Sequence, residues 1–381
     1  AIGKIAIKEF IPMQDGDIHK TTSDTDKLNN WIDFVTAKAG TLIGGLTFLN
    51  NWIIRSEISD ALSKIYIRNV KTNEEEEWKI TEEEVITQGI SLKQKNKNTD
   101  IIRVAYDSPK TPSRTFEYNI KTKEKKLVKE QIVPSGHVRD NYIVKRINCE
   151  AHDGRQIPMT ITYHKQTKLD GSAHVLLYGY GSYGMSMSPN FSSTRLSLVD
   201  RDIIWVTCHI RGGMERGMRW WKEGKMLNKK NTFSDFISCA KFLIEKKYTS
   251  KKKLIAFGGS AGGLLLGNII NQIPDLLLGA IMAVPFVDNL TTNMDHSLPL
   301  TKGELLEFGD AKNNKEHFEY IRSYAPYDNL EKKDYPNILI TTSLSDSRVL
   351  FDEPTKYCAK LRDLKTDNNL LFLKCEMDAG H

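Results

Sequence analysis

A serine among glycines is the residue of this sequence best suited to nucleophilic chemistry. Residues 258–262 read Gly-Gly-Ser-Ala-Gly, directly after an apolar run and directly before a run with helical spacing. In the tight turn of such a strand–turn–helix unit the serine hydroxyl projects above the sheet, and its neighbours must be small. The amide of Ala261 then points to where an oxyanion forms. We therefore expect Ser260 to be a nucleophile; the alternative is a glycine-rich turn with an incidental serine.

A serine nucleophile needs a general base, and the base needs an acid that orients it. In α/β-hydrolases the chain order is serine, aspartate, histidine, each near the end of a strand. After Ser260, the apolar run 338–342 leads into Asp346, and the run 370–374 leads into His381. These positions predict a triad of Ser260, Asp346 and His381. The weaker candidates for the acid and the base are Asp352, Asp378, His296 and His317.

A second oxyanion donor must come from another loop. Residues 178–184 read Tyr-Gly-Tyr-Gly-Ser-Tyr-Gly and follow the apolar run 173–178. Three glycines in seven residues give a flexible loop beside the expected serine turn, and a tyrosine hydroxyl in it is able to donate to an oxyanion. The alternative is a loop whose aromatic side chains only pack.

The elements that position these residues divide the chain into two parts. Residues 1–134 are rich in short β-type runs separated by turns, and the segment 64–73 is echoed by 114–123. A strand–turn–strand unit repeated at this period is typical of β-propeller blades, the alternative being a generic antiparallel sheet. The strands expected in this part are 46–54, 65–70, 78–80, 101–106 and 115–120.

From residue 173 onward, apolar runs alternate with helical patterns, which predicts an α/β fold with a mostly parallel sheet. Residues 135–172 form a linker and an entry hairpin that turns at Asp153 and Gly154. A helix is expected to begin near Asn231 and Thr232, with these residues as caps. The expected strands of the sheet are 173–178, 203–208, 254–257, 280–284, 338–342 and 370–374, and further helices are expected at 262–272 and 353–364.

Composition excludes several classes of protein. The 381 residues are 40% hydrophobic and 27% charged, with 54 basic and 48 acidic side chains, which is an ordinary globular balance. The basic residues do not cluster on any nucleic-acid-binding module, and no apolar stretch is long enough to span a membrane. Five widely spaced cysteines indicate buried thiols in a reducing compartment. We expect a cytoplasmic protein with no cofactor, no metal site and no partner protein.

Six motifs together strongly resemble the prolyl oligopeptidase family. Two of them, with the segment 361–367, look like its oligopeptidase B branch, also called protease II. The resemblance covers the whole chain and is dense from about residue 140 onward. The motifs occupy residues 177–184, 210–213, 258–263, 284–288, 324–328 and 377–381.

The resemblance implies an α/β-hydrolase peptidase domain capped by a β-propeller that admits only short peptides. Its triad falls on Ser260, Asp346 and His381, and its oxyanion donors are Tyr180 and the amide of Ala261. The expected domains are the last propeller blades at 1–134, the linker and hairpin at 135–172, and a catalytic domain at 173–381 without its C-terminal helix. Because the sequence begins without Met and ends at His381, we expect a fragment of a longer protein.

The resemblance also suggests a substrate. Oligopeptidase B enzymes cleave after Arg or Lys with acidic residues of a Gly-Glu-x-Glu-Glu stretch, and the matching residues here include Glu304 and Glu307. Leu306 replaces the middle acid. Arg348 is a second departure, because the prolyl branch has an arginine there that binds a substrate carbonyl. Basic specificity is therefore expected to be weakened, and a prolyl-specific oligopeptidase is the alternative.

Two further readings stay open at the level of sequence. An α/β-hydrolase esterase would use the same triad, but it would not carry propeller blades. A non-enzymatic relative would normally have lost a triad residue, and none is missing from the pattern. We expect a serine endopeptidase whose only partners are short peptide substrates.

Overall fold

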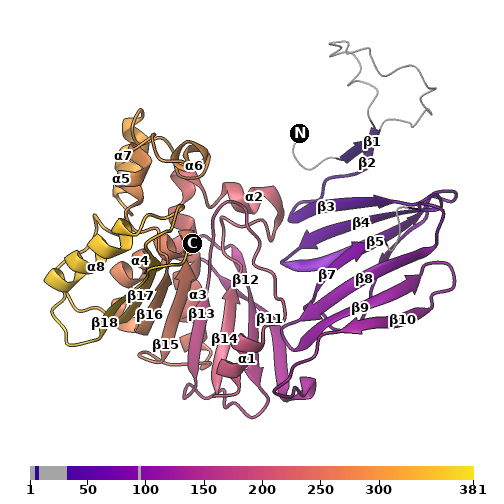
Figure 1. Ribbon diagram of the computed structural model, residues 1–381, viewed down its shortest axis with the longest axis horizontal. Coiled ribbons are helices and arrows are strands. Elements are labelled where there is room, and N and C mark those ends of the chain that lie inside the picture. Colours follow the sequence, from indigo (N-terminus) through magenta and orange to yellow (C-terminus); the bar gives the residue numbers. More distant parts are fainter. Residues whose placement is uncertain (1–4, 8–31, 93–95) are drawn as a thin grey trace.

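The computed structural model describes residues 5–7, 32–92 and 96–381, which form two parts (Figure 1). Two four-stranded antiparallel sheets make up the N-terminal part, and an eight-stranded sheet flanked by helices makes up the rest. The predicted order, propeller-type sheets followed by an α/β-hydrolase fold, is confirmed. Residues 1–4, 8–31 and 93–95 of the expected domain 1–134 lie outside the described residues.

The repeat predicted from sequence is present as the same strand–turn–strand unit in both small sheets. The Asn69 side chain accepts hydrogen bonds from the two backbone amides of Lys71 and Thr72, and Asn119 caps the equivalent turn fifty residues later in the same way. The strands of the first sheet are β3 (Thr41–Phe48), β4 (Trp52–Ser59), β5 (Leu62–Asn69) and β6 (Glu75–Trp78), and those of the second are β7 (Thr87–Ser91), β8 (Ile101–Ser108), β9 (Thr111–Asn119) and β10 (Lys125–Glu130). A separate pair consists of β1 (Ile5–Ile7) and β2 (Ile32–Val35).

Two predicted strands of this part are wrong in their bounds. The apolar run 46–54 is not one strand: the chain turns between β3 and β4, where the amide of Leu49 donates to the carbonyl of Trp52. The strand expected at 78–80 lies earlier, because the acidic run that precedes Trp78 pairs with basic side chains of β5. Arg68 reaches Glu75 at 3.1 Å in this way. Hydrophobic spacing alone does not detect a strand held by cross-strand ion pairs.

The large sheet has the strand order β11-β12-β14-β13-β15-β16-β17-β18. The hairpin predicted around Gly154 is confirmed as β11 and β12, and the strands from β14 to β18 are parallel. This arrangement places the ends of β13, β15, β17 and β18 at one edge, which is where parallel sheets carry ligands. The strands are β11 (Tyr142–Glu150), β12 (Gln156–His164), β13 (His174–Tyr178), β14 (Ile203–Cys208), β15 (Leu254–Gly259), β16 (Leu277–Ala283), β17 (Asn337–Ser343) and β18 (Leu371–Glu376).

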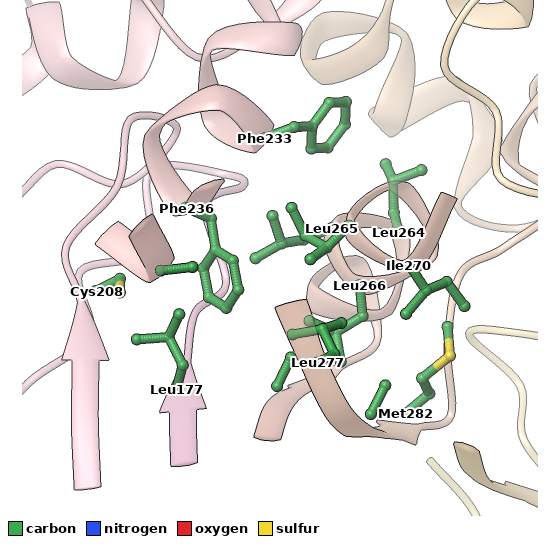
Figure 2. Close-up of a cluster of buried hydrophobic side chains, with 14 of the residues drawn as sticks. Leu177, Cys208, Phe233, Phe236, Leu264, Leu265, Leu266, Ile270, Leu277 and Met282 are labelled. Atoms are coloured by element: carbon green, nitrogen blue, oxygen red, sulfur yellow. The ribbon is translucent and has the colours of Figure 1, made fainter. Parts of the chain in front are cut away.

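Helices cover both faces of this sheet. Figure 2 shows the core between the sheet and two of them, where Phe236 and Leu265 pack above Leu177. A smaller cluster around Trp205 lies under α1. The helices are α1 (Ser193–Val199), α2 (Gly217–Lys222), α3 (Lys230–Glu245), α4 (Ala261–Gln272), α5 (Asn289–Met294), α6 (Thr301–Phe308), α7 (Lys315–Arg322) and α8 (Asp352–Leu364).

The predicted cap of α3 is wrong. The helix starts at Lys230, and neither Asn231 nor Thr232 caps it. The Thr232 hydroxyl instead donates to the carbonyl of Arg211 at 2.9 Å. Thr232 is buried beneath neighbouring loops, and the buried carbonyl groups of these loops need hydrogen-bond donors. The Thr232 hydroxyl serves one of them and is therefore not available to cap the helix.

Candidate active site

Ser260 occupies the turn between β15 and α4, as its motif predicts. Its backbone has φ 54° and ψ −122°, a conformation that L-residues rarely adopt and that marks strain at a functional turn. The Ser260 amide donates to the carbonyl of Ala283 at 2.9 Å, and its own carbonyl accepts from the amide of Phe286 at 3.0 Å. The strain is therefore held by backbone hydrogen bonds to the end of β16 and to the segment that follows it.

The glycines of the motif are required by close backbone contacts. A Cβ on Gly258 would stand 2.5 Å from the carbonyl oxygen of Gly262, and one on Gly263 would stand 2.3 Å from the Cα of Pro285. No side chain fits at these distances without movement of the backbone. The turn is thus packed tightly enough to fix the direction of the Ser260 side chain.

The structure brings Asp346 and His381 together. The loop after β17 buries Asp346, and His381 Nδ1 lies 2.8 Å from Asp346 Oδ2. Asp346 Oδ1 accepts from the backbone amides of Arg348 and Val349, at 2.9 and 3.0 Å. These two amides hold the carboxylate in one orientation, and the carboxylate in turn orients the imidazole.

The segment that carries His381 is attached to the loop that carries Asp346. The amide of Leu344 donates to the carbonyl of Glu376 at 2.9 Å, and the Ser343 hydroxyl donates to the carbonyl of Ala379. The side chain of His381 is 17% exposed. The hydrogen bonds that hold this segment come from residues 343–346, at the end of β17 and in the loop after it.

Tyr180 and Ser260 line one cavity of about 320 Å³ at the carboxyl edge of the sheet. Burial raises the pKa of the Tyr180 phenol and outweighs the hydrogen-bonding interaction with Ser260, which lowers it. Tyr180 is therefore a neutral phenol that keeps its proton and can donate it to a hydrogen bond. A larger cavity of about 680 Å³ lies on the other side of Tyr180, beside Trp205, and does not include Ser260.

The two acidic residues expected to bind substrate have different surroundings. Glu304 lines the cavity of Ser260 and accepts a hydrogen bond from the Tyr183 hydroxyl at 3.0 Å. Burial raises the pKa of Glu304. Glu307 is 2% exposed, and Lys229 and Trp221 hold its carboxylate oxygens at 3.3 and 2.7 Å.

Two further residues are expected to weaken basic specificity, Arg348 and Leu306. Arg348 lines the cavity of Ser260 together with Glu304. Leu306, which stands in place of the family's middle acid, is 71% exposed. Of the three glutamate-type positions, only that of Glu304 presents a carboxylate to the space beside Ser260.

Sequence reasoning missed the groups that support the Tyr180 loop. Arg211 is buried and pairs with Asp235 and Asp153. A Cβ on Gly212 would lie 1.9 Å from the carbonyl oxygen of Gly181, so the backbone of this segment lies directly against the Tyr180 loop. Lys229, also buried, donates to the same carbonyl at 2.7 Å. Arg211 stands in a recognisable motif, whereas Lys229 carries no sequence signal, since lysines next to lysines are normally solvated.

Neither a metal site nor a membrane span occurs in the part of the chain that the structure describes. Within residues 5–7, 32–92 and 96–381, no cluster of His, Cys, Asp and Glu has the composition to hold a metal ion. None of the helices in those ranges combines the length and the apolar character that a bilayer requires.

Known families match both parts of the chain. The prolyl oligopeptidase family matches residues 189–381, and the N-terminal β-propeller domain of prolyl oligopeptidase matches residues 14–131. The chain belongs to the prolyl oligopeptidase family. The boundaries of the two matches differ from the expected domain limits at 134 and 172, which stay predictions.

Relatives within the prolyl oligopeptidase family include both curated proteins and solved structures. The chain is 39% identical over 360 residues to dipeptidyl aminopeptidase BI of Pseudoxanthomonas mexicana, covering 94% of this chain and 49% of the relative. It is 44% identical over 290 residues to protease 2 of Moraxella lacunata, covering 76% and 42%. Oligopeptidase B from Leishmania major superposes with a TM-score of 0.85 at 36% identity, covering 92% and 50%. The chain therefore spans about half the length of the relatives it matches.

Proposed function

We propose that this chain forms the catalytic part of a serine oligopeptidase that hydrolyses short peptides through an acyl-enzyme. The observation that carries the proposal is the constellation at one sheet edge: Ser260 on a strained turn, the 2.8 Å pair of His381 and Asp346, and the Tyr180 phenol. Each of these groups has a defined part in acyl transfer. The propeller match separates the proposal from an open esterase.

The chemistry follows from these groups in two steps. His381 takes the proton of the Ser260 hydroxyl while its oxygen bonds to the peptide carbonyl carbon, and the resulting oxyanion accepts hydrogen bonds from Tyr180 and the Ala261 amide. The C–N bond then breaks, and the amine leaves with the proton from His381. In the second step water attacks the ester, His381 relays its proton to Ser260, and the acid is released. Asp346 stabilises the imidazolium throughout.

The proposed substrates are peptides cut after Arg or Lys. Glu304 supports this choice because its carboxylate lines the cavity of Ser260, where a guanidinium or ammonium group would form a charge-assisted hydrogen bond. Arg348 lines the same cavity and opposes a cationic side chain. The second candidate function is cleavage after proline, with Arg348 as a ligand of the substrate carbonyl.

The relatives support a peptide substrate but differ in the kind of cleavage that their names state. They include a dipeptidyl aminopeptidase, a protease 2 and a prolyl endopeptidase from Elizabethkingia meningoseptica. We propose endopeptidase action on short peptides, with the propeller part limiting the size of the substrate. Fluorogenic peptides with free and with blocked N-termini would separate endopeptidase from aminopeptidase action.

Ser260→Ala tests the proposal directly. Because triad members act as a unit, the substitution should lower kcat by about a million-fold, and a fluorophosphonate probe should label the wild type but not the variant. His381→Ala should be about as severe. Labelling that survives Ser260→Ala would overturn the assignment of the nucleophile. Higher turnover of prolyl than of arginyl substrates by the wild type would favour the second candidate.

A further inference from the structure

Lys229 is a buried cation at the base of the active-site loops. It lies between the short 3-10 turn Met226–Asn228 and the start of α3, and it is 1% exposed. Its ammonium group has three partners: the carbonyl of Gly181 at 2.7 Å, the hydroxyl of Ser182 at 2.6 Å and the carboxylate of Glu307 at 3.3 Å. A lysine has three N–H donors, so every donor of Lys229 is used inside the protein.

The three partners belong to two separate parts of the site. Gly181 and Ser182 directly follow Tyr180, and Glu307 lies on α6, one turn after Glu304. The loop and the helix also touch through Tyr183, whose ring stacks edge-on against Phe308 with centroids 5.8 Å apart and whose hydroxyl contacts Glu304. Lys229 is therefore a charged group that links the Tyr180 loop to α6, the helix that carries Glu304.

The loop has little freedom to take up another position. Gly181 has φ 71°, and a Cβ on it would stand 2.3 Å from Cγ2 of Thr232. If Lys229 were removed, the carbonyl of Gly181 would keep the long contact of 3.5 Å with the Thr232 hydroxyl, and a poorly paired buried carbonyl costs free energy. The structure thus stabilises one loop conformation, and that conformation places the Tyr180 hydroxyl beside Ser260.

We propose that Lys229 is a positioning residue: it fixes the position of the oxyanion donor Tyr180 relative to Glu304, the acidic residue proposed to bind the substrate side chain. This inference rests on the proposed function. The buried ion pair with Lys229 also explains why the Glu307 carboxylate does not face the cavity. Of these two glutamates, Glu304 alone then supplies negative charge to the cavity. A positioning error of about 1 Å in such a group is enough to cost a hundred-fold in rate.

The test removes the ion pair as a unit and then measures how much Tyr180 still contributes. Lys229→Met/Glu307→Leu leaves no unpaired buried charge, and replacing a buried pair by apolar residues is often tolerated. In this double variant we expect kcat for an arginyl fluorogenic peptide to fall about 10- to 100-fold. In the same background Tyr180→Phe should cost only a few-fold, against about 100-fold in the wild type.

The selectivity arm of the experiment uses the ratio of kcat/KM for arginyl and alanyl peptides. This ratio should fall in the double variant, because Glu304 loses its support through α6. The control is Lys333→Met/Glu331→Leu. Lys333 likewise donates to a backbone carbonyl, that of Asn271, and to a carboxylate, that of Glu331. Neither Lys333 nor Glu331 lines the cavity of Ser260. This control variant should leave kcat, selectivity and the effect of Tyr180→Phe unchanged.

An undiminished effect of Tyr180→Phe in the Lys229→Met/Glu307→Leu background would overturn the inference. If that double variant does not fold, Ser182→Ala supplies the test, since it removes one acceptor of Lys229 and keeps the charge pair. We expect Ser182→Ala to lower kcat several-fold and to weaken the effect of Tyr180→Phe; an effect equal to that in the wild type would again overturn the inference. Failure of the proposed function is distinguishable, because it would show as absent turnover in the wild type itself.

Discussion

At the scale of single residues, the candidate site depends on which groups keep a proton and which are free to meet substrate. Burial raises the pKa of Tyr180, so the phenol is a hydrogen-bond donor across the ordinary pH range. Glu304 and Arg348 face the same cavity with opposite charge. Glu307 is withdrawn from it by Lys229. These assignments lead to two predictions about rate and selectivity.

Tyr180→Phe removes one hydroxyl and should lower kcat by about 100-fold or more, since one oxyanion donor supplies on the order of 3 kcal/mol to the transition state. KM should change much less, because the hydrogen bond strengthens only as negative charge develops on the oxygen. Steady-state kinetics with an arginyl peptide would measure both constants. Tyr178→Phe, two residues earlier, is the control and should leave kcat close to that of the wild type. Equal turnover of wild type and Tyr180→Phe at saturating substrate would show that Tyr180 only packs.

Glu304→Gln and Glu307→Gln should have different consequences. We expect Glu304→Gln to reduce kcat/KM for an arginyl peptide more than for an alanyl one, by about 1.5–3 kcal/mol, the range of a charged hydrogen bond. Glu307→Gln leaves Lys229 buried without its counter-charge, so it should lower the melting temperature, slow the cleavage of both peptides, and reduce arginyl selectivity less than Glu304→Gln does. Kinetics on the two peptides and thermal unfolding of both variants would separate these effects. A loss of arginyl selectivity in Glu307→Gln as large as that in Glu304→Gln, without a lower melting temperature, would show that Glu307, too, meets the substrate.

At the scale of elements, the sequence predicts the short-range features of the site well. The turn around Ser260, the strand ends before Asp346 and His381, and the hairpin at Gly154 are specified by neighbouring residues, and each lies where its motif indicates. The sequence pattern misplaces β6 and gives no indication of β10. The polar residues of both strands pair across the sheet instead of alternating with apolar ones. Lys229 was missed for a related reason: its burial is decided by loops about fifty residues before it and a helix about eighty residues after it.

Gly258→Ala tests how tightly the strand–turn–helix element is packed. The added methyl group would stand 2.5 Å from the carbonyl oxygen of Gly262, so the turn must shift, and such overpacking typically costs about 1–3 kcal/mol. We expect a lower melting temperature together with slower labelling by a fluorophosphonate. Gly45→Ala is the matched control, because nothing lies within 4 Å of its added methyl group. Normal labelling and stability of Gly258→Ala would mean that the turn is looser than its contacts indicate.

At the scale of the whole molecule, the turn between β4 and β5 is one of the places where the propeller-type sheets meet the α/β-hydrolase part of the chain. The Ala61 amide donates to the backbone carbonyl of Glu215, and Arg146 donates to the carbonyl of Ala61, both at 2.9 Å. Arg216 pairs with Asp60 in the same contact. A cavity of about 120 Å³ adjoins it and is lined by Ala61 and Glu215. The turn between β4 and β5 thus lies against the segment that carries Glu215, and a separate contact joins the side chain of Asp107 to the amide of Phe191 at 3.2 Å.

The Glu215 carboxyl group is surrounded by partners that do not compensate for a full negative charge. It accepts from the amide of Met187 at 2.8 Å, and His209 Nδ1 lies 3.8 Å away. Burial lowers the pKa of His209 well below its usual value, so this ring is neutral. Burial raises the pKa of Glu215 to about 7 and outweighs the Met187 amide and the charge of Arg146, which both lower it.

We expect this raised pKa to make the contact at Ala61 pH-dependent. In the unfolded chain Glu215 ionises near its ordinary value of 4.5, whereas in the folded state it keeps its proton up to about pH 7. The folded state binds more protons between these values, so the stability that Glu215 contributes is complete below pH 4.5 and is lost as the pH rises to 7. Glu215→Gln should remove this share of the decline. Hydrogen exchange of the amides around Ala61, followed from pH 4.5 to 7.5 and corrected for the intrinsic rate, measures it locally.

Glu353 provides the comparison that localises the effect to the contact. Burial also raises its pKa to about 7, but its carboxyl group accepts hydrogen bonds from the Thr292 hydroxyl and the Asp288 backbone amide, both within the α/β-hydrolase part. Glu353→Gln should therefore flatten the pH dependence of overall stability and leave the loss of protection around Ala61 as it is in the wild type. Glu215→Gln should abolish that local loss. Equal protection around Ala61 at pH 4.5 and pH 7.5 in the wild type would show that the two parts are held together independently of the charge on Glu215.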